Sequence, residues 1–293
     1  MTGNRKGIIL AGGNGTRLYP MTRVVTKQLL PVYDKPLIYY PLSILMLLSI
    51  REVLIIVKDY DLHLFQRLLG DGSHLGMKFS YEIQDEPRGL PEAFIIGRDF
   101  IGDDPVTMAL GDNIFYGSGL VTFLEYYMDK EHKGASAFSY SVKDPQRFGV
   151  ANYDTQGRVI SLEEKPQNPK SPWAVSGLYH FDSDVAEKAA RLKPSGRGEL
   201  EIMDLLSLYH QEGRLQVYRM PRGYAWLDTG TTEAMMKAGQ YIQILEERQG
   251  IKVACIEEIA YIQKFINRAQ LEALIAKIGN NSYSDYLKNL LGA

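Results

Sequence analysis

Short strand-like runs alternate with longer segments of helical pattern over the first half of the chain. Residues 7–10, 52–57, 78–83 and 106–110 have strand character, and residues 52–57 are apolar enough for a strand that is buried on both faces. Residues 36–50, 62–69 and 90–98 have the length and pattern of helices. This alternation predicts an α/β fold with a Rossmann-like, mostly parallel twisted sheet and helices on both faces.

The second half of the chain is richer in strands. Residues 135–141, 149–153, 159–163 and 174–181 have strand character, whereas residues 199–210 and 231–248 have helical character. The tail at 257–291 is helical, with breaks at Gly279 and Asn280. We therefore expect one main domain over residues 1–250, with a first part at about 1–134 and a β-rich insertion at about 135–230. A helical C-terminal extension is expected over residues 251–293.

Composition narrows the class of protein. The 293 residues include 33 basic and 35 acidic side chains, so the formal net charge is −2 and gives no general reason to expect nucleic-acid or membrane binding. The longest apolar stretch, residues 41–50, is about half of the roughly 20 residues that a membrane span needs. No signal peptide is visible, so we expect a cytoplasmic location. The single Cys255 excludes an intrachain disulfide and a multi-cysteine metal site.

A glycine-rich loop, LAGGNGTRLYP at residues 10–20, follows the first strand. Glycine lets the backbone approach a ligand closely, and successive N–H groups in such a loop can hold phosphate oxygens. Arg17 adds a planar, permanently charged group that suits phosphate. The loop therefore predicts a nucleoside triphosphate site. An ordinary glycine-rich turn is the alternative, which the nearby Lys27 and Lys35 disfavour.

Two familiar glycine motifs do not fit this loop. A Walker A loop requires a Gly-Lys-Ser/Thr sequence, which is absent from residues 10–20. The dinucleotide fingerprint requires a third glycine where Leu18 stands. A dinucleotide-dependent dehydrogenase is therefore disfavoured.

Carboxylates follow apolar segments at two further places. Asp112 comes directly after the strand at 106–110, and Asp228 lies in the segment AWLDTG. Two carboxylates together with substrate phosphates form the ligand set that Mg²⁺ prefers. The alternative is a turn or helix N-cap aspartate, above all for Asp228, which precedes a predicted helix. In the segment LEEKP, strand alternation would point one of Glu163 and Glu164 into a pocket, unless both belong to a solvated edge.

With these pieces assembled, the chain resembles the sugar-1-phosphate nucleotidylyltransferases, and within them the family of glucose-1-phosphate thymidylyltransferases. The resemblance rests on segments that occur in the expected order and span nearly the whole chain. These segments are IILAGGNGTRLYPMT at 8–22, KQLLPVYDKP at 27–36, LGDNIFYG at 110–117, SLEEKP at 161–166, SGRGELEI at 195–202 and GYAWLDTG at 223–230.

The resemblance implies that a sugar 1-phosphate attacks the α-phosphorus of a nucleoside triphosphate and that pyrophosphate leaves. The substrates that the resemblance implies are dTTP and α-D-glucose 1-phosphate, and the implied cofactor is Mg²⁺. The reaction would then be the first step of dTDP-deoxysugar biosynthesis, such as that of dTDP-rhamnose. Positioning and charge neutralisation would carry the catalysis. The implied catalytic residues are Arg17, Lys27, Asp112, Lys165 and Asp228, of which Asp112 and Asp228 would hold the metal.

The resemblance also divides the binding residues between the two substrates. The first part of the domain would bind the nucleotide through Leu10, Ala11, Gly12, Gly13, Gly15, Thr16, Arg17, Gln84, Gly89 and Asp112. Gln84 would read the thymine edge, because an amide carries both a donor and an acceptor. The β-rich insertion would bind the sugar phosphate through Gly149, Glu164, Lys165, Val175 and Arg197. A homo-oligomer, commonly a tetramer in the family, is implied as well.

The chain departs from the family pattern at a few positions. Phe148 stands where tyrosine is usual, Ser118 stands where histidine is frequent, and residues 85–92 are more charged than usual. Ile262 stands where many relatives carry an arginine of a second, regulatory nucleotide site, and isoleucine cannot pair with a diphosphate. We therefore expect weakened feedback inhibition by a dTDP-sugar. UTP or another hexose 1-phosphate as substrate, and a catalytically silent homologue that binds nucleotide sugars, are the alternatives.

Overall fold

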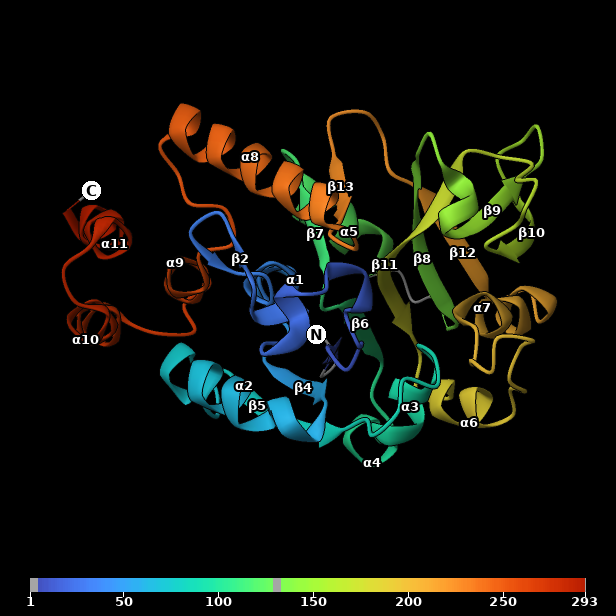
Figure 1. Ribbon diagram of the computed structural model, residues 1–293, viewed down its shortest axis with the longest axis horizontal. Coiled ribbons are helices and arrows are strands. Elements are labelled where there is room, and N and C mark those ends of the chain that lie inside the picture. The colour runs from blue at the N-terminus through green and yellow to red at the C-terminus, as the bar shows by residue number, and fades with distance from the viewer. Residues whose placement is uncertain (1–4, 129–132, 293) are drawn as a thin grey trace.

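A nine-stranded sheet forms the centre of the computed structural model, which describes residues 5–128 and 133–292 (Figure 1). The main path of the sheet is β10-β9-β11-β6-β1-β4-β5, and β8 and β12 extend it from β11. The strands are β1 Lys6–Leu10, β4 Glu52–Val57, β5 Lys78–Ile83, β6 Val106–Leu110, β8 Ala135–Ser141, β9 Gly149–Tyr153, β10 Val159–Glu164, β11 Trp173–Phe181 and β12 Leu215–Arg219.

Most strands of this sheet point in one direction. Strands β6, β1, β4 and β5 are mutually parallel, and β11 joins β6 in the antiparallel sense. Among the described strands of the sheet, β10 and β11 alone run against the others. The predicted mostly parallel sheet is therefore confirmed. The carboxyl ends of β1, β5 and β6 lie at one edge, where the glycine-rich loop, Gln84 and Asp112 follow them.

Helices cover both faces of the sheet, as predicted. Side chains alternate along β4, so that Ile55 packs in one core and Leu54 in the other. The first core includes side chains from α1 Tyr39–Leu47, α2 Leu62–Leu69 and α5 Leu120–Met128. The second includes side chains from α3 Glu92–Ile96, α4 Arg98–Ile101, α6 Val185–Ala190 and α7 Ile202–Gln211. Burial on both faces explains the unbroken apolar run of residues 53–57.

Several element boundaries differ from those that the sequence predicts. The helix expected over 36–50 begins only at Tyr39, because Lys35–Pro36 (β3) pairs with Pro31–Val32 (β2) in a short hairpin. The helix expected over 90–98 is replaced by α3 and α4, which meet at Gly97. A Cβ at Gly97 would lie 3.0 Å from both Ala93 O and Leu54 Cδ2, so a larger residue there would be tightly packed against its neighbours.

A second, two-stranded sheet is absent from the sequence-based prediction. Strand β7 Asn113–Tyr116 pairs in antiparallel register with β13 Ala225–Asp228, so that Asp228 lies opposite Asn113. This pairing brings the segment after β6 beside a segment from the far end of the domain. It is the element that places Asp228 next to Asp112.

The chain ends in four helices, α8 Thr232–Gln249, α9 Ile256–Ile262, α10 Arg268–Ile278 and α11 Ser282–Gly292, and the last three lie at one end of the molecule (Figure 1). The predicted break near Gly279 is confirmed. A further break at 263–267 was not predicted, and there Asn267 and Gln270 form a capping box for α10. Among the described residues, no helix combines the length and apolar character that crossing a membrane requires.

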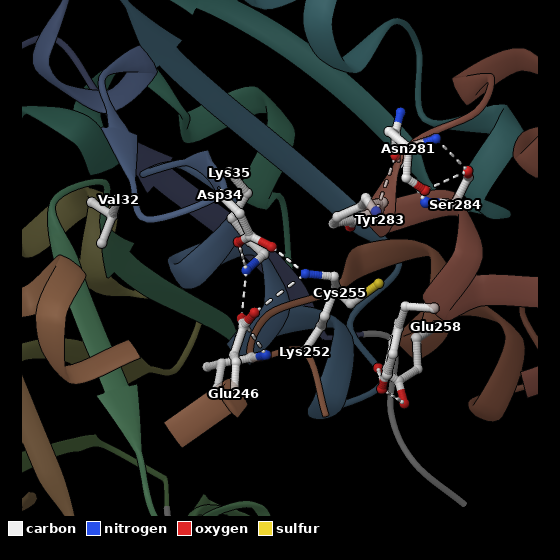
Figure 2. Close-up of polar contacts among 12 residues, drawn as sticks. Val32, Asp34, Lys35, Glu246, Lys252, Cys255, Glu258, Asn281, Tyr283 and Ser284 are labelled. Atoms are coloured by element: carbon white, nitrogen blue, oxygen red, sulfur yellow. Dashed lines mark hydrogen bonds and ion pairs between the residues drawn. The ribbon is translucent and has the colours of Figure 1, made fainter. Parts of the chain in front are cut away.

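A charge cluster around the buried Lys35–Glu246 pair attaches the start of this C-terminal segment to the β2–β3 hairpin. Figure 2 shows Asp34, Lys35, Glu246 and Lys252 pointing toward one another. Lys35 Nζ donates to Asp34 and, at 2.8 Å, to Glu246 Oε1, while Lys252 pairs with the same two carboxylates. The two lysines balance the charge of the two carboxylates. The cluster therefore holds the hairpin, helix α8 and the following segment together without a net buried charge.

Candidate active site

One cavity of about 430 Å³ lies over the carboxyl ends of the central strands and extends toward β9, β10 and α7. Its wall includes most of the site residues that the sequence predicts. These are Leu10, Gly13, Arg17, Gln84, Gly89, Asp112, Gly149, Glu164, Lys165, Val175, Arg197 and Asp228. The remaining ones, Ala11, Gly12, Gly15, Thr16 and Lys27, lie in the adjoining loops rather than in the cavity wall.

The glycine-rich loop leaves β1 with its backbone fixed at both ends. The Ala11 N–H donates to Ile56 O at 2.7 Å, and Thr22 Oγ1 donates to Gly15 O at 2.8 Å. Gly15 has a φ of +59°, a left-handed conformation that favours glycine. A short 3₁₀ helix, Thr16–Leu18, follows and carries Arg17 to the cavity wall. The loop therefore brings the backbone of Gly13 and one guanidinium to the same edge of the sheet.

Asp112 and Lys27 form a partly buried ion pair although they lie 85 positions apart, with 2.5 Å between Lys27 Nζ and Asp112 Oδ2. The other carboxylate oxygen accepts from Asn113 Nδ2 at 2.7 Å. Burial by itself would raise the pKa of Asp112. The charge and hydrogen bond of Lys27, the hydrogen bond of Asn113 and the charge of Arg17 outweigh that effect and hold the pKa below its ordinary value. Asp112 is therefore a carboxylate, ready to bind a cation.

Asp228 faces the same part of the cavity. Thr229 Oγ1 donates to the backbone carbonyl of Asp112 at 2.8 Å, which ties the two aspartate segments together. Burial, followed by the neighbouring charge of Asp112, raises the pKa of Asp228. The alternative of a helix N-cap is wrong for this residue, because Thr231 caps α8 by accepting a hydrogen bond from Ala234 N.

Asp112 and Asp228 are the carboxylates of the cavity wall that could hold a divalent cation. Two repelling carboxylates near one cavity gain from a cation between them, and carboxylate oxygens are the hard ligands that Mg²⁺ takes. Within residues 5–128 and 133–292, no group of three or more His, Cys, Asp or Glu side chains is arranged to hold a metal.

Glu164 and Lys165 stand at the opposite end of the cavity, where β10 ends. Glu164 lines the cavity, whereas Glu163 lies in the cross-strand contact with Asn152, whose Nδ2 donates to Glu163 Oε1 at 2.8 Å. Burial raises the pKa of Glu164, against the opposing charge of Lys165. Lys165 itself has a φ of 42°, and its N–H donates to Phe148 O at 3.1 Å. The strained backbone fixes the direction in which this lysine leaves the strand.

Arg197 closes this end of the cavity from a loop before α7. Its guanidinium donates to Glu164 Oε1 at 3.1 Å and to Glu201 Oε2 at 2.6 Å. Glu201 is buried and also accepts from Ser195 Oγ at 2.5 Å. Burial would raise the pKa of Glu201, but Arg197 and Ser195 outweigh it and hold the pKa below its ordinary value. Glu201 is thus a charged anchor that holds Arg197 at the cavity.

The wall between the two ends is apolar and aromatic. The rings of Phe148 and Trp226 lie 5.1 Å apart, and both line the cavity. A Cβ at Gly149 would lie 2.6 Å from Met203 Sδ, so glycine makes room for that side chain. Val175 completes the wall from β11. The two rings give this part of the wall an apolar surface.

Gln84 and Gly89 line the cavity as well, and Gln84 lies beside Gly12 of the glycine-rich loop. Gln84 is buried, and its Nε2 donates to Glu92 Oε2 at 2.7 Å. Gly89 has a φ of +108°, and a Cβ there would lie 2.0 Å from Leu200 O, since the two residues form an isolated β-bridge. Glycine at 89 is therefore required for the contact with the Leu200 backbone, a role that the sequence alone does not indicate.

The structure adds site residues that the sequence analysis did not single out. Three of them lie inside the motifs that carry the resemblance, namely Asn113, Trp226 and Glu201. Their position close to a predicted site residue in the sequence was the signal that could have identified them. Trp226 Nε1 donates to Asn113 Oδ1 at 2.5 Å, across 113 positions of sequence. Arg147 lines the cavity with its Nη2 3.7 Å from Asp228 Oδ2, and nothing in the sequence marked it.

Ile262 lies outside this cavity. It is 63% exposed at the end of α9 and lines a separate, open hollow with Lys264, Asn267 and their neighbours. No carboxylate or arginine lines that hollow among the described residues. Lys264 is its one charged side chain there.

Comparisons with known proteins agree with this geometry. Residues 6–244 match the model of the nucleotidyl transferase family. A glucose-1-phosphate thymidylyltransferase of Neisseria meningitidis serogroup A / serotype 4A is 52% identical over 286 residues, which cover 98% of this chain and 99% of that protein. The enzyme of the same name from Mycobacterium tuberculosis is 49% identical over 286 residues, which cover 98% of this chain and 99% of that protein.

Solved structures show the same fold. A Bacillus anthracis protein in complex with sucrose has a TM-score of 0.75 and 40% identity, covering 81% of this chain and 94% of that chain. A UDP-glucose pyrophosphorylase complexed with UDP-glucose has a TM-score of 0.73 at 23% identity, covering 82% of this chain and 99% of that chain. The second likeness concerns the fold alone.

Proposed function

The chain belongs to the nucleotidyl transferase family, and we propose that it joins dTTP to α-D-glucose 1-phosphate to give dTDP-glucose and pyrophosphate. Relatives of about 50% identity over nearly the whole chain carry the name glucose-1-phosphate thymidylyltransferase, which supports this activity. The first step of dTDP-deoxysugar biosynthesis is the place that this reaction would take.

One observation carries the proposal: cationic side chains reach a single cavity from two separate parts of the sheet, the loop after β1 at one end and the end of β10 at the other. Arg17 lines one end beside the Lys27–Asp112 pair, and Lys165 and Arg197 line the other. A molecule with one phosphate group needs only one such end. Two phosphorylated substrates that react with each other need both, facing across a common wall.

The reaction requires positioning more than proton transfer. An oxygen of the sugar phosphate forms a bond to the α-phosphorus, and the bond from that phosphorus to the bridging oxygen of pyrophosphate breaks, so that pyrophosphate leaves with the electron pair. The attacking oxygen is already anionic, so no general base is needed. Arg17 and Lys27 would neutralise the triphosphate and the departing pyrophosphate. Lys165 and Arg197 would hold the sugar phosphate in line.

We assign the remaining predicted residues to these two substrates. Leu10, Ala11, Gly12, Gly13, Gly15, Thr16, Gln84 and Gly89 would surround the nucleotide, with the loop N–H groups on its phosphates. Gly149, Glu164 and Val175 would surround the sugar, with Glu164 accepting from its hydroxyl groups. Lys27 would shift from Asp112 toward the phosphates when the nucleotide binds.

Mg²⁺ is the proposed cofactor, and Asp112 and Asp228 would hold it. When bound, the ion neutralises phosphate charge and fixes the geometry of the triphosphate. Asn113 would keep the Asp112 carboxylate in place, because it donates to one oxygen and is itself held by Trp226. Thr229 would keep the two aspartate segments at a constant separation.

Organisation beyond the site stays a prediction. We propose that residues 1–134 form the nucleotide part, residues 135–230 the sugar part and residues 251–293 the helical extension. A homo-oligomer, a tetramer by resemblance, is consistent with the exposed Met236 and Ile244 on α8. Light scattering of the purified protein would measure its mass. Location in the cytoplasm is expected as well.

The test is pyrophosphate release with Mg²⁺ over a matrix of dTTP, UTP and other triphosphates against several sugar 1-phosphates. The highest kcat/KM is expected for dTTP with glucose 1-phosphate. Asp112→Asn should lower it by about 100-fold or more, because the variant loses a charge that acts in the transition state. Asp103→Asn is the matched control. Asp103 is an exposed aspartate that precedes the N-terminal end of β6, whereas Asp112 follows the carboxyl end of the same strand. A higher kcat/KM with UTP or another hexose would change the substrate assignment. No turnover with any pair would favour the silent, nucleotide-sugar-binding homologue.

A further inference from the structure

Gln84 is held rigidly at the wall of the cavity. It follows β5 directly, its backbone N–H donates to Val57 O at 2.8 Å, and it is only 3% exposed. Its side chain lies against the glycine-rich loop, since a Cβ at Gly12 would lie 2.6 Å from Gln84 Oε1. A side chain this confined can change what it offers to a ligand chiefly by rotating its amide, which exchanges the positions of the oxygen and the NH₂ group.

Glu92 removes that freedom. Gln84 Nε2 donates to Glu92 Oε2 at 2.7 Å, and the Arg88 backbone N–H donates to the same oxygen at 3.3 Å. A carboxylate accepts hydrogen bonds and donates none, so the amide must turn its NH₂ group toward Glu92. In the opposite orientation the amide oxygen would face the carboxylate, and a charge-assisted hydrogen bond would become a repulsive contact.

The amide oxygen is consequently the atom left for a ligand. Oε1 lies beside Gly12, and among the residues that the structure describes none donates a hydrogen bond to it. Because glycine has no Cβ at this point, the oxygen is not covered from the side of the loop. The wall therefore offers a fixed acceptor, together with the second N–H of the amide as a donor.

We propose that Glu92 is a specificity-determining positioning residue, which locks Gln84 so that the site selects bases with a ring N–H, thymine or uracil, over cytosine. The inference rests on the proposed function, because that function places the base at Gln84. Glu92 does not line the cavity and acts only through Gln84. It belongs to the segment 85–92, whose charge departs from the family pattern.

The chemistry of the bases explains the selection. Thymine and uracil carry N3–H between two carbonyl oxygens, so N3–H can donate to Oε1 while the free amide N–H donates to a carbonyl. Cytosine has an unprotonated N3, whose lone pair would face the lone pairs of Oε1. Cytosine could pair only by sliding along its edge, which the anchored triphosphate resists. A buried acceptor that is left unpaired makes such discrimination large.

The experiment compares dUTP with dCTP, which differ only in the donors and acceptors of the base edge. The ratio of their kcat/KM values with glucose 1-phosphate is measured for wild type and for Glu92→Gln. The wild type should prefer dUTP strongly, and the variant should lose at least about tenfold of that preference, which corresponds to about 1.4 kcal/mol. The loss is expected because a glutamine at 92 can accept or donate and no longer fixes the amide of Gln84. The ratio is taken within one preparation, so a partly unfolded variant does not change it.

Glu86→Gln is the matched control, because Glu86 is an exposed carboxylate on the same segment and pairs with Arg88 at 3.5 Å. In the part of the chain that the structure describes, Glu86 forms no hydrogen bond or ion pair with Gln84. It should keep the wild-type ratio. Glu92→Leu provides a second variant that should lose the preference as Glu92→Gln does. An unchanged ratio in both Glu92 variants, or a wild type that does not discriminate, would overturn the inference.

Failure of the proposed function would be seen separately, as no nucleotide-sugar formed by the wild type from any triphosphate. Calorimetric binding of dUTP and dCTP then tests the inference in the same variants, with the same expected loss of preference. Equal affinities of the wild type for the two nucleotides would overturn it in that case as well.

Discussion

Lys35→Met should destabilise the protein strongly, although the residue lies outside the cavity. The Lys35 side chain is only 1% exposed and contacts Asp34 and, at 2.8 Å, Glu246, whose side chain is 5% exposed (Figure 2). Methionine nearly matches the length of lysine but leaves two carboxylates with one lysine, Lys252. An excess negative charge is then buried.

The size of the expected loss in unfolding free energy follows from the burial of the side chains that contact Lys35. Removing one member of a buried ion pair costs about 3–5 kcal/mol. Lys252 Nζ stays 3.3 Å from Glu246 Oε2, and the Val253 N–H donates to Glu246 Oε1 at 2.9 Å, so we expect the lower end, about 3 kcal/mol. At about 2 °C per kcal/mol for a chain of this size, Tm should fall by about 6 °C.

The assay is urea denaturation followed by circular dichroism, together with thermal melting. Lys78→Met is the matched control, because Lys78 is 72% exposed and pairs with Glu52 at 3.3 Å. Its loss of unfolding free energy should stay below about 1 kcal/mol. Adding Glu246→Gln to Lys35→Met should recover part of the loss, since the excess charge disappears. A Lys35→Met variant as stable as the Lys78→Met control would refute the reasoning.

The sign of the pH dependence provides an independent check. Burial would raise the pKa of Asp34, but hydrogen bonds and charges from Lys252 and Lys35 outweigh it and lower the pKa. A lowered carboxyl pKa contributes stability above the ordinary pKa of about 3.9, and this stability is lost as the pH falls through the folded-state value. The gap in unfolding free energy between wild type and Lys35→Met should therefore narrow in acid.

Three further predictions concern other positions. Gly89→Ala should cost about 2 kcal/mol or more in unfolding free energy, because the added Cβ would meet Leu200 O. Gly196→Ala should be nearly neutral, because its Cβ would have no atom within 4 Å, and urea denaturation of both variants measures the difference. Burial raises the pKa of the Cys255 thiol, so a thiol reagent at pH 8 should react with it only after denaturation, and rapid labelling of the folded protein would contradict its burial. Burial also raises the pKa of Glu257, so its ionisation destabilises the fold as the pH rises above the ordinary glutamate pKa of about 4.3. Unfolding free energies over a pH series should therefore rise for Glu257→Gln relative to wild type as the pH increases from there, and a constant difference would count against the shift.

Sequence patterns predicted the longer uninterrupted strands best, at the centre of the sheet and at its edge. The strands at 52–57, 78–83 and 106–110 have the bounds that were predicted. The short strands β7 and β13 were missed, because four-residue segments carry too little periodicity to be recognised without their partner. The start of α1 was misplaced because the hairpin contact of Pro36 depends on a partner strand.

The candidate site shows the same division. The residue types in the glycine-rich loop, and aspartates directly after strands, indicated phosphate and metal chemistry from local sequence alone. Whether Glu163 or Glu164 faces the cavity was not decided by the residues, since alternation fixes opposite directions but not which direction is inward. The resemblance indicated Glu164, and the cavity wall includes Glu164. Arg147 had no local signal, because a lone charged residue in a turn is usually solvated.

By itself, the sequence determined the order of the elements, the two-sided burial of the central strands and the chemical character of each motif, because these depend on neighbouring residues. Only the tertiary structure decided that Lys27 lies 2.5 Å from Asp112, that Trp226 holds Asn113, and that Glu92 fixes the amide of Gln84. The physical reason is that such distances result from the packing of whole elements. Hydrogen bonds across 85 or 113 positions form only when the sheet, the hairpin and the β7–β13 pair have all assembled.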